Sequence, residues 1–195
     1  NAIFDGPANF LDTSRNYGAG RSEERLGHVI KACGGIPKGF VVATKLDRDP
    51  DTNSFAADAM RRSLEKSLKA LNLDRVGLLH LHDPEYAANL DDVTRTGGGI
   101  ETLYRMKEEG YCDAVGLAAG RVDIMMPILD RFAFDAMITH NRFTLVNRNA
   151  DAMIDAATAK GIAVINAAPF AGGVFARGSD VNPRYVYQEA SEEML

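Results

Sequence analysis

Short apolar runs recur along the chain, and between them lie longer segments in which apolar residues return every three or four positions. The short runs are rich in Val, Ile, Leu or Phe and do not alternate strictly with polar residues. This pattern is typical of strands covered on both faces of a parallel sheet. The runs predict strands at residues 9–12, 40–45, 76–82, 114–118, 134–139 and 162–167.

The longer segments predict amphipathic helices. Apolar side chains at helical spacing define two of them, one through Leu26, Val29, Ile30 and Cys33 and one through Met60, Leu64, Leu68 and Leu71. Further helices are expected at about 100–109, 122–131 and 149–160. Gly110 and Gly161 close two of these segments, whereas Pro127 would ordinarily interrupt the helix in which it lies.

A strand followed by a helix, repeated at intervals of roughly thirty residues, predicts parallel βα units. Such units build either an open doubly wound sheet or a closed (β/α)8 barrel. A dinucleotide-binding open sheet requires the pattern G-x-G-x-x-G after its first strand. Gly18 and Gly20 follow a predicted strand, but Glu23 occupies the place of the third glycine. The sequence therefore favours the α/β class with a (β/α)8 TIM barrel.

The length of the chain limits how much of a barrel it can hold. A complete barrel needs eight units and typically about 250 residues, whereas 195 residues are present and six units are visible. We therefore expect a single domain over residues 1–195, an incomplete barrel that lacks the first and last units. A helix-like segment at 191–195 ends the chain.

Composition and charge indicate which kinds of molecule the protein binds. The net charge of −5 and the pI of about 5.4 argue against binding to nucleic acid or to an anionic membrane surface. No apolar run approaches the roughly 20 residues of a spanning helix, and no signal peptide is evident. The two cysteines, Cys33 and Cys112, show no metal-binding spacing and suit a reducing compartment. We expect a cytoplasmic protein acting on small molecules; its oligomeric state is not indicated.

Barrel enzymes place their chemistry at the carboxyl ends of the strands. Asp12, Lys45 and His82 end the first three predicted strands, and Tyr17 lies in the loop after Asp12. An ammonium near a phenol favours the phenolate and lowers its pKa from about 10. Asp12 could pair with Lys45, and His82 could hydrogen-bond and orient a substrate oxygen. A hydride acceptor above this cluster would complete an alcohol–carbonyl redox site.

Each of these residues alone has an ordinary structural explanation, such as a cap, a turn or surface packing. Four of them in this order at strand ends favour the functional interpretation. A metal-dependent hydrolase remains an alternative, because His80 and His82 share one strand face and Asp83 and His140 could be further ligands. The small number of histidines speaks against it, and His80 is expected to be a satisfied residue of the barrel interior.

Four segments of the sequence resemble the aldo-keto reductase family. They are FLDTSRNYG at 10–18, SEERLG at 22–27, VVATK at 41–45 and LDRVGLLHLHDP at 73–84. The resemblance implies a barrel enzyme that moves hydride between NAD or NADP and a carbonyl or hydroxyl group. It also implies roles: Tyr17 as the proton donor or acceptor, Lys45 and Asp12 as the residues that tune it, and His82 as the orienting group.

The resemblance also points to the cofactor-binding residues. The family's Ser-Asn pair after the fifth strand is replaced by Ala118–Ala119, so that either His140 or Asn141 would hold the nicotinamide amide. The segment APFAGG at 168–173, which contains Phe170 and Gly172, is similar to the family segment whose backbone approaches the cofactor diphosphate. The choice between NAD and NADP is not implied.

Variant positions narrow the resemblance to one branch of the family. The sequence HDP at 82–84 stands where many members have HWP, which makes the substrate mouth more polar. Together with NAAPF at 166–170, this resembles the L-fucose, D-threo-aldose and L-galactose 1-dehydrogenases and pyridoxal 4-dehydrogenase. The implied reaction oxidises the C1 hydroxyl of an aldose to a lactone, or reduces aldehydes in reverse. A non-catalytic NADP(H)-binding regulatory subunit, like the potassium-channel β-subunits that share the fold, is the other alternative.

Overall fold

The structure, a computed structural model, describes residues 2–178, 180–186 and 188–192. The chain divides into two compact units, residues 1–118 and residues 119–195. The predicted helix-like segment at 191–195 falls largely outside the described residues. The expectation of a single domain over residues 1–195 stays a prediction.

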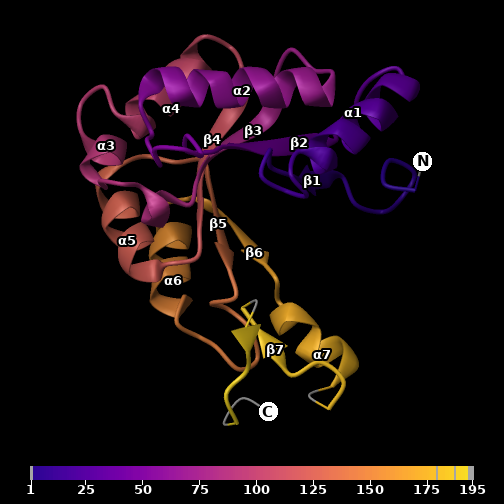
Figure 1. Cartoon of the computed structure of the whole chain (residues 1–195), viewed down its shortest axis with the longest axis vertical. Coiled ribbons are helices and arrows are strands. Elements are labelled where there is room, and N and C mark those ends of the chain that lie inside the picture. The colour runs from indigo at the N-terminus through magenta and orange to yellow at the C-terminus, as the bar shows by residue number, and fades with distance from the viewer. Residues whose placement is uncertain (1, 179, 187, 193–195) are drawn as a thin grey trace. The chain divides into compact units, whose positions relative to one another are not determined.

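Parallel strands form the centre of the first unit (Figure 1). They are β1 (Phe10–Asp12), β2 (Val41–Leu46), β3 (Val76–His82) and β4 (Cys112–Ala119), and they pair in chain order. The register places Asp12 beside Ala43, Lys45 beside His80, and His82 beside Ala118. In a parallel sheet this register brings the carboxyl ends of neighbouring strands to one edge.

Helices of the first unit follow the strands. They are α1 (Arg21–Ala32), α2 (Ala57–Leu71), the short 3-10 helix η1 (Pro84–Tyr86), α3 (Asp91–Thr94) and α4 (Gly99–Glu108). The predicted apolar face of α1 is correct except at Cys33, which lies beyond the end of the helix and is exposed. Helix α1 approaches α2 closely because residue 27 is glycine: a Cβ atom there would lie 1.9 Å from the carbonyl oxygen of Ala70.

The second unit contains two more βα repeats and a hairpin. Its elements are α5 (Val122–Arg131), β5 (Ala136–His140), α6 (Asp151–Ala159), β6 (Ala163–Ala167), η2 (Ala171–Gly173), α7 (Val174–Arg177), β7 (Arg184–Tyr185) and β8 (Gln188–Glu189). Strands β5 and β6 are parallel, with Thr139 beside Asn166, whereas β7 and β8 are antiparallel. Helix α5 occupies the predicted range and continues through Pro127. Because Met125, Ile128 and Leu129 remain buried, its apolar face holds the helix despite the missing N–H donor.

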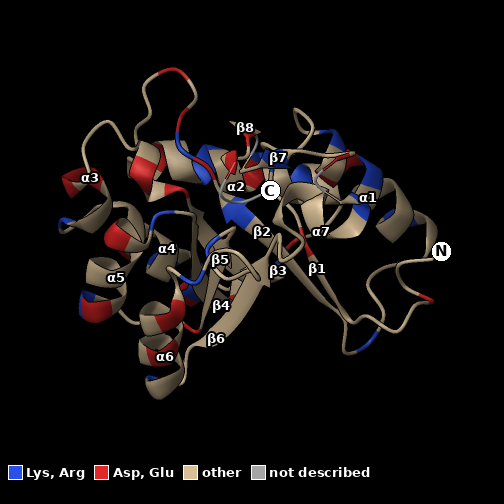
Figure 2. Cartoon of the chain, turned by 90° about the horizontal axis from the view of Figure 1, so that it is seen from below, with Lys and Arg blue, Asp and Glu red and all other residues tan. Residues whose placement is uncertain are grey.

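All six predicted strands and all five predicted helices are present, and their order is that of the βα units of an incomplete barrel. The largest difference that bears on the site is at β2, which continues to Leu46 rather than ending at Lys45. Acidic and basic residues are interspersed over the helices (Figure 2). Within the described part of the chain, no helix combines the length and apolar character needed to cross a bilayer.

Candidate active site

Strands β2 and β3 place four polar residues on one side of the first unit's sheet. Side chains two residues apart on a strand share a face, so Lys45 lies on the same face as Asp47, and His80 on the same face as His82. The register pairs Lys45 with His80 and Leu46 with Leu81. One step further along, Asp47 therefore comes beside His82.

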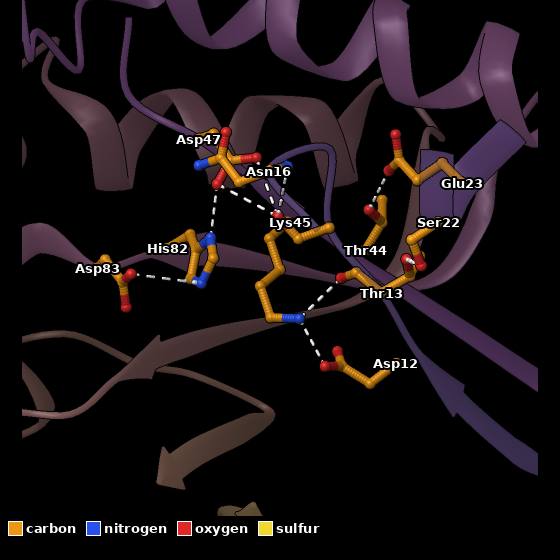
Figure 3. Close-up of polar contacts among 11 residues, drawn as sticks. Asp12, Thr13, Asn16, Ser22, Glu23, Thr44, Lys45, Asp47, His82 and Asp83 are labelled. Carbon is orange, nitrogen blue, oxygen red and sulfur yellow. Dashed lines mark hydrogen bonds and ion pairs between the residues drawn. The ribbon is translucent and has the colours of Figure 1, made fainter. Parts of the chain in front are cut away.

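Lys45 forms a buried ion pair with Asp12. Its side chain is 1% exposed, and Nζ donates to Asp12 Oδ2 at 2.5 Å and to the carbonyl oxygen of Thr13 at 2.7 Å (Figure 3). Burial lowers the pKa of Lys45, and the carboxylate of Asp12 opposes this shift. Burial likewise raises the pKa of Asp12, and the ammonium of Lys45 opposes it. Each charge thus offsets part of the desolvation of the other.

Tyr17 lies against this ion pair. The Nζ atom of Lys45 is 4.6 Å from the centroid of the Tyr17 ring, and the rings of Tyr17 and His82 are nearly perpendicular with centroids 6.1 Å apart. The loop is held by its own backbone, since Tyr17 N donates to Ser14 O at 3.1 Å and Ser22 N donates to Tyr17 O at 3.3 Å. The four residues predicted to converge therefore do lie together.

His82 is held between two carboxylates at the end of β3. Its Nδ1 atom shares a short hydrogen bond with Oδ1 of Asp47, and its Nε2 atom lies 3.6 Å from Oδ2 of Asp83 (Figure 3). His82 is buried, with 8% of the residue exposed. Asp83 adopts a positive φ of 48° before Pro84, and its backbone N–H donates to Ala118 O at 2.8 Å. The backbone on both sides of His82 is thus fixed by neighbouring strands.

Asp47 is the residue at this site that sequence reasoning missed. It is 6% exposed and joins three segments. Besides His82 on β3, its Oδ2 atom accepts a hydrogen bond from Ser14 Oγ at 3.0 Å, and its backbone N–H donates to Ser63 Oγ at 3.0 Å. The signal that could have revealed it is the spacing K-x-D, which places a carboxylate on the same strand face as the lysine.

A second buried carboxyl group lies on the opposite face of β2. Glu23 of α1 is fully buried, and its Oε1 atom accepts a hydrogen bond from the Thr44 hydroxyl at 2.6 Å. Burial raises the pKa of Glu23, and the bond from Thr44 opposes the shift. Thr44 precedes Lys45 on the strand, so its side chain points to the opposite face. The contact with Glu23 therefore joins α1 to β2 on the face of the sheet opposite the candidate site.

His80 is buried as predicted, but it is not satisfied as predicted. It is 0% exposed, and neither ring nitrogen has a hydrogen-bond partner within the described residues. Burial, with smaller contributions from Lys45 and His82, lowers its pKa to about 3, so the ring is neutral. The described residues contain no group of three potential metal ligands that includes His80 or His82.

In the second unit, the residues predicted to hold the nicotinamide amide interact with each other. His140 ends β5, and its Nδ1 atom lies 3.1 Å from Nδ2 of Asn141. Asn141 is 2% exposed, adopts a positive φ of 57°, and donates its backbone N–H to Ala167 O at 3.3 Å. The hydroxyl of Tyr185 donates to Asn141 O. The side chains of His140 and Asn141 therefore contact each other at the end of β5.

The predicted diphosphate-binding segment follows β6 in the same unit. Phe170 is 63% exposed, and Gly172 has a φ of 70°. A Cβ atom on Gly172 would approach Arg184 O to 3.2 Å, so the turn is compact as well as left-handed. Before the turn, Asn166 Oδ1 is buried and has no hydrogen-bond partner within the described residues, although Nδ2 donates to Phe143 O at 2.9 Å.

Comparison with curated proteins found relatives that are named as dehydrogenases. An L-galactose dehydrogenase of Arabidopsis thaliana is 32% identical over 85% of this chain and 52% of its own length. A D-threo-aldose 1-dehydrogenase of a Pseudomonas species is 27% identical over 99% of this chain and 65% of its own. A pyridoxal 4-dehydrogenase of Microbacterium luteolum is 21% identical over 100% and 66%. The chain thus spans between about half and two thirds of the length of these relatives.

Solved structures confirm the fold. An aldo-keto reductase of Pseudomonas aeruginosa is 30% identical over 81% of this chain and 59% of its own, with a TM-score of 0.66. An aldo-keto reductase of Bacillus halodurans superposes with a TM-score of 0.72 at 23% identity over 90% and 58%. One from Klebsiella pneumoniae, solved with NADPH, gives a TM-score of 0.71 at 19% identity over 90% and 58%. The predicted incomplete barrel is therefore correct.

The family model for the aldo/keto reductases matches residues 1–195. Members of this family generally use NAD(P)H as cofactor. The family predicted from four short sequence segments is confirmed over the whole chain. The chain belongs to the aldo/keto reductase family.

Proposed function

We propose that the full-length protein is an NAD(P)-dependent oxidoreductase that oxidises the C1 hydroxyl of an aldose to a lactone, and reduces aldehydes in the reverse direction. The observation that carries this proposal is the contact of Lys45 with both Asp12 and the ring of Tyr17. A buried ammonium beside a phenol is the arrangement that proton transfer to or from a tyrosine oxygen requires.

In this proposal Tyr17 exchanges the proton of the reacting hydroxyl group. The ammonium of Lys45 stabilises the negative charge that the phenol oxygen bears once its proton has left. Asp12 keeps the ammonium in place and charged despite its burial. His82, oriented at its Nδ1 atom by Asp47, presents Nε2 to a substrate oxygen. The bound cofactor would supply the redox chemistry, by accepting or donating a hydride.

The second unit offers groups that suit such a cofactor. Asn141 and His140 are hydrogen-bonding groups at the end of β5, and Oδ1 of Asn166 is a buried acceptor near the end of β6 that has no partner among the described residues. A carboxamide has both a donor and an acceptor to match such groups. The left-handed backbone at Gly172 suits close approach to a diphosphate, and Phe170 is exposed beside it. We assign these residues to NAD or NADP.

The substrate class rests on the polar mouth and on the relatives. Asp83 follows His82 with its carboxylate 24% exposed, and hydroxyl groups are the donors that such a carboxylate accepts from. The L-galactose and D-threo-aldose dehydrogenases to which the chain is similar are named for sugars. A cytoplasmic location, in keeping with the two widely spaced cysteines, remains part of this proposal.

The test is a turnover assay of the full-length protein. We expect reduction of NAD+ or NADP+, followed by absorbance, with at least one of L-fucose, L-galactose, D-arabinose and pyridoxal. Tyr17→Phe keeps the ring and removes the proton-exchanging oxygen, so kcat should fall by about 1000-fold. Cofactor affinity, measured by fluorescence titration, should change less than about twofold.

Two results would contradict the proposal. If Tyr17→Phe retains the rate of the unmodified protein, the phenol does not exchange the proton. If the full-length protein binds NADP(H) but turns over neither sugars nor aldehydes, the non-catalytic regulatory subunit becomes the better explanation.

A further inference from the structure

We propose that a hollow between α1 and α2 is a second binding site, which takes the phosphate group of a small phosphorylated molecule. The polar residues that line this hollow are Arg15, Glu24, His28, Lys66, Lys69 and Asn72, and its volume is about 400 Å³. Cavities of this size bind small molecules in many proteins. All of these residues lie in the first unit, and none of them belongs to the candidate active site. The inference therefore stands apart from the proposed function.

The hollow is positively charged, although the chain as a whole is negative. Arg15, Lys66 and Lys69 contribute three positive charges and Glu24 contributes one negative charge, so that these four residues carry a net charge of +2. The whole chain, by contrast, carries −5. A phosphate monoester bears a charge of about −1.5 to −2 near neutral pH. Its charge therefore matches that of the hollow in size and is opposite in sign.

The two lysines of the hollow lack the acidic partners that other cations of α2 have. Arg61 and Arg62, on the same helix, both form ion pairs with carboxylates. Lys66 and Lys69 form neither an ion pair nor a hydrogen bond within the described part of the chain. Because they are three residues apart, their side chains are neighbours on the helix surface, and their like charges repel each other. A bound anion between them would offset this repulsion.

The guanidinium of Arg15 is already held in place at the edge of the hollow. Its Nη1 atom donates to Gly20 O at 3.2 Å, and its Nη2 atom donates to Glu24 Oε1 at 3.2 Å. The absence of a side chain at Gly20 makes room for it, since a Cβ atom there would lie 2.5 Å from Arg15 Cζ. A guanidinium has five N–H donors, so donors remain for a phosphate. Because the group is fixed beforehand, binding costs it little conformational entropy.

Uncharged groups complete the lining of the hollow. Asn72 ends α2 in the left-handed conformation, with a φ of 54°. Its amide lies directly against α1, because Nδ2 would be only 3.0 Å from a Cβ atom built on Gly27. The amide of Asn72 and the ring of His28 provide donors and acceptors beside the three cations. Such groups suit the hydroxyls of a small phosphorylated molecule, in addition to its phosphate.

Lys66 and Lys69 could instead be ordinary solvated lysines on an exposed helix face. In that case a phosphate would interact with them no more strongly than with any other pair of exposed lysines. Lys31 and Lys38 provide such a pair, because both are exposed and neither lines the hollow. Replacing either pair by glutamine changes the net charge of the protein by the same amount. A difference between the two double variants therefore reports on the hollow rather than on overall charge.

The experiment is isothermal titration calorimetry of the full-length protein with glycerol 3-phosphate as the probe, without cofactor. At about 0.1 M NaCl, charges more than about 10 Å apart are largely screened. A few charge-assisted hydrogen bonds should give saturable binding with a Kd below about 1 mM. Lys66→Gln combined with Lys69→Gln should raise the Kd at least about tenfold. Lys31→Gln combined with Lys38→Gln should change it less than about threefold.

A third variant tests the shape of the hollow rather than its charge. Asn72→Gly removes the amide and keeps the left-handed conformation that ends α2, so it should raise the Kd by about two- to fivefold. The inference is wrong if glycerol 3-phosphate shows no saturable binding, if both double variants weaken binding equally, or if Asn72→Gly binds as tightly as the unmodified protein. None of these outcomes depends on whether the protein oxidises a sugar.

Discussion

The carboxyl ends of the strands differ in kind between the two units. At β1, β2 and β3 the polar groups are charged and paired, as in the Lys45–Asp12 ion pair and the Asp47–His82 hydrogen bond. At β5 and β6 the arrangement consists of a neutral amide, an imidazole and backbone groups around Asn141. Paired charges can stabilise a moving proton, whereas neutral groups and left-handed backbone can hold a ligand without altering its charge.

Under the proposed function, this difference predicts that the two sets of strand ends have different roles. Substitutions at the strand ends of the first unit should act on kcat, and those at the strand ends of the second unit should act on cofactor affinity. A substitution in the first unit that changes only cofactor affinity, or one in the second unit that changes only kcat, would contradict this expectation. The predictions that follow are made for the full-length protein and run from the largest expected effect to the smallest.

Lys45→Met keeps the length of the side chain and removes its charge. We expect kcat to fall by about 100- to 1000-fold, because the phenol of Tyr17 loses the ammonium that stabilises its ionised form. The free energy of unfolding should also fall by about 3 kcal/mol, because the carboxylate of Asp12 is left without its partner. Steady-state kinetics and denaturant unfolding measure the two effects.

Lys160→Met is the matched control for this substitution. It removes an ammonium from an exposed ion pair with Asp130, and its effect on stability should stay below about 1 kcal/mol. If Lys45→Met keeps the kcat of the unmodified protein, the ammonium of Lys45 does not take part in proton transfer and has only a structural role.

His80→Met tests whether the interior of the first unit excludes charge. Because burial lowers the pKa of His80 to about 3, the folded protein keeps this ring neutral, while the unfolded chain takes up a proton below its ordinary pKa of 6.5. The stability that depends on His80 is therefore complete above pH 6.5 and is lost as the pH falls toward 3.

The measurement is denaturant unfolding at several pH values between 7 and 4. The free energy of unfolding should fall more steeply in the unmodified protein than in His80→Met, by up to about 1.4 kcal/mol per pH unit. Parallel curves would mean that His80 binds a proton in the folded state. His28→Met, at an exposed position of α1, controls for the substitution itself.

Asn141→Asp tests the second unit. Aspartate tolerates the positive φ of this position almost as well as asparagine does, but it replaces the amide donor with a negative charge. We expect about tenfold weaker cofactor binding and a kcat within about threefold at saturating cofactor. Fluorescence titration measures the affinity, and Asn149→Asp, at an exposed position, is the control. If kcat falls while cofactor affinity is unchanged, Asn141 acts in catalysis rather than in cofactor binding, which contradicts the expected role of the second unit.

Much of the fold was predictable because its elements are long and periodic. Buried runs such as 76–82 and stripes such as that through Met60 and Leu64 leave little choice of structure. The short elements η1, α3, η2, α7, β7 and β8 were not predicted. They are two to four residues long, and local turns rather than periodic burial define them.

The candidate site was predictable where residues end strands. Asp12, Lys45 and His82 were found in this way, and Tyr17 by its place after Asp12. Asp47 was missed because it lies beyond the predicted end of β2, and only the register of β2 with β3 shows that it comes beside His82. The contact of Asn141 with His140 depends on a left-handed backbone that no local pattern indicated.

The close approach of α1 to α2 at Gly27 bears on the chemistry, although it lies on the outside of the sheet. The bare backbone at this position fixes how far the first helix stands from the second. That helix begins four residues after Tyr17, and the backbone N–H of Ser22 within it donates to Tyr17 O, so the helix and the loop are directly joined. A larger residue at position 27 would push the helix that carries Ser22 away from α2, because a Cβ atom has no room beside the carbonyl oxygen of Ala70.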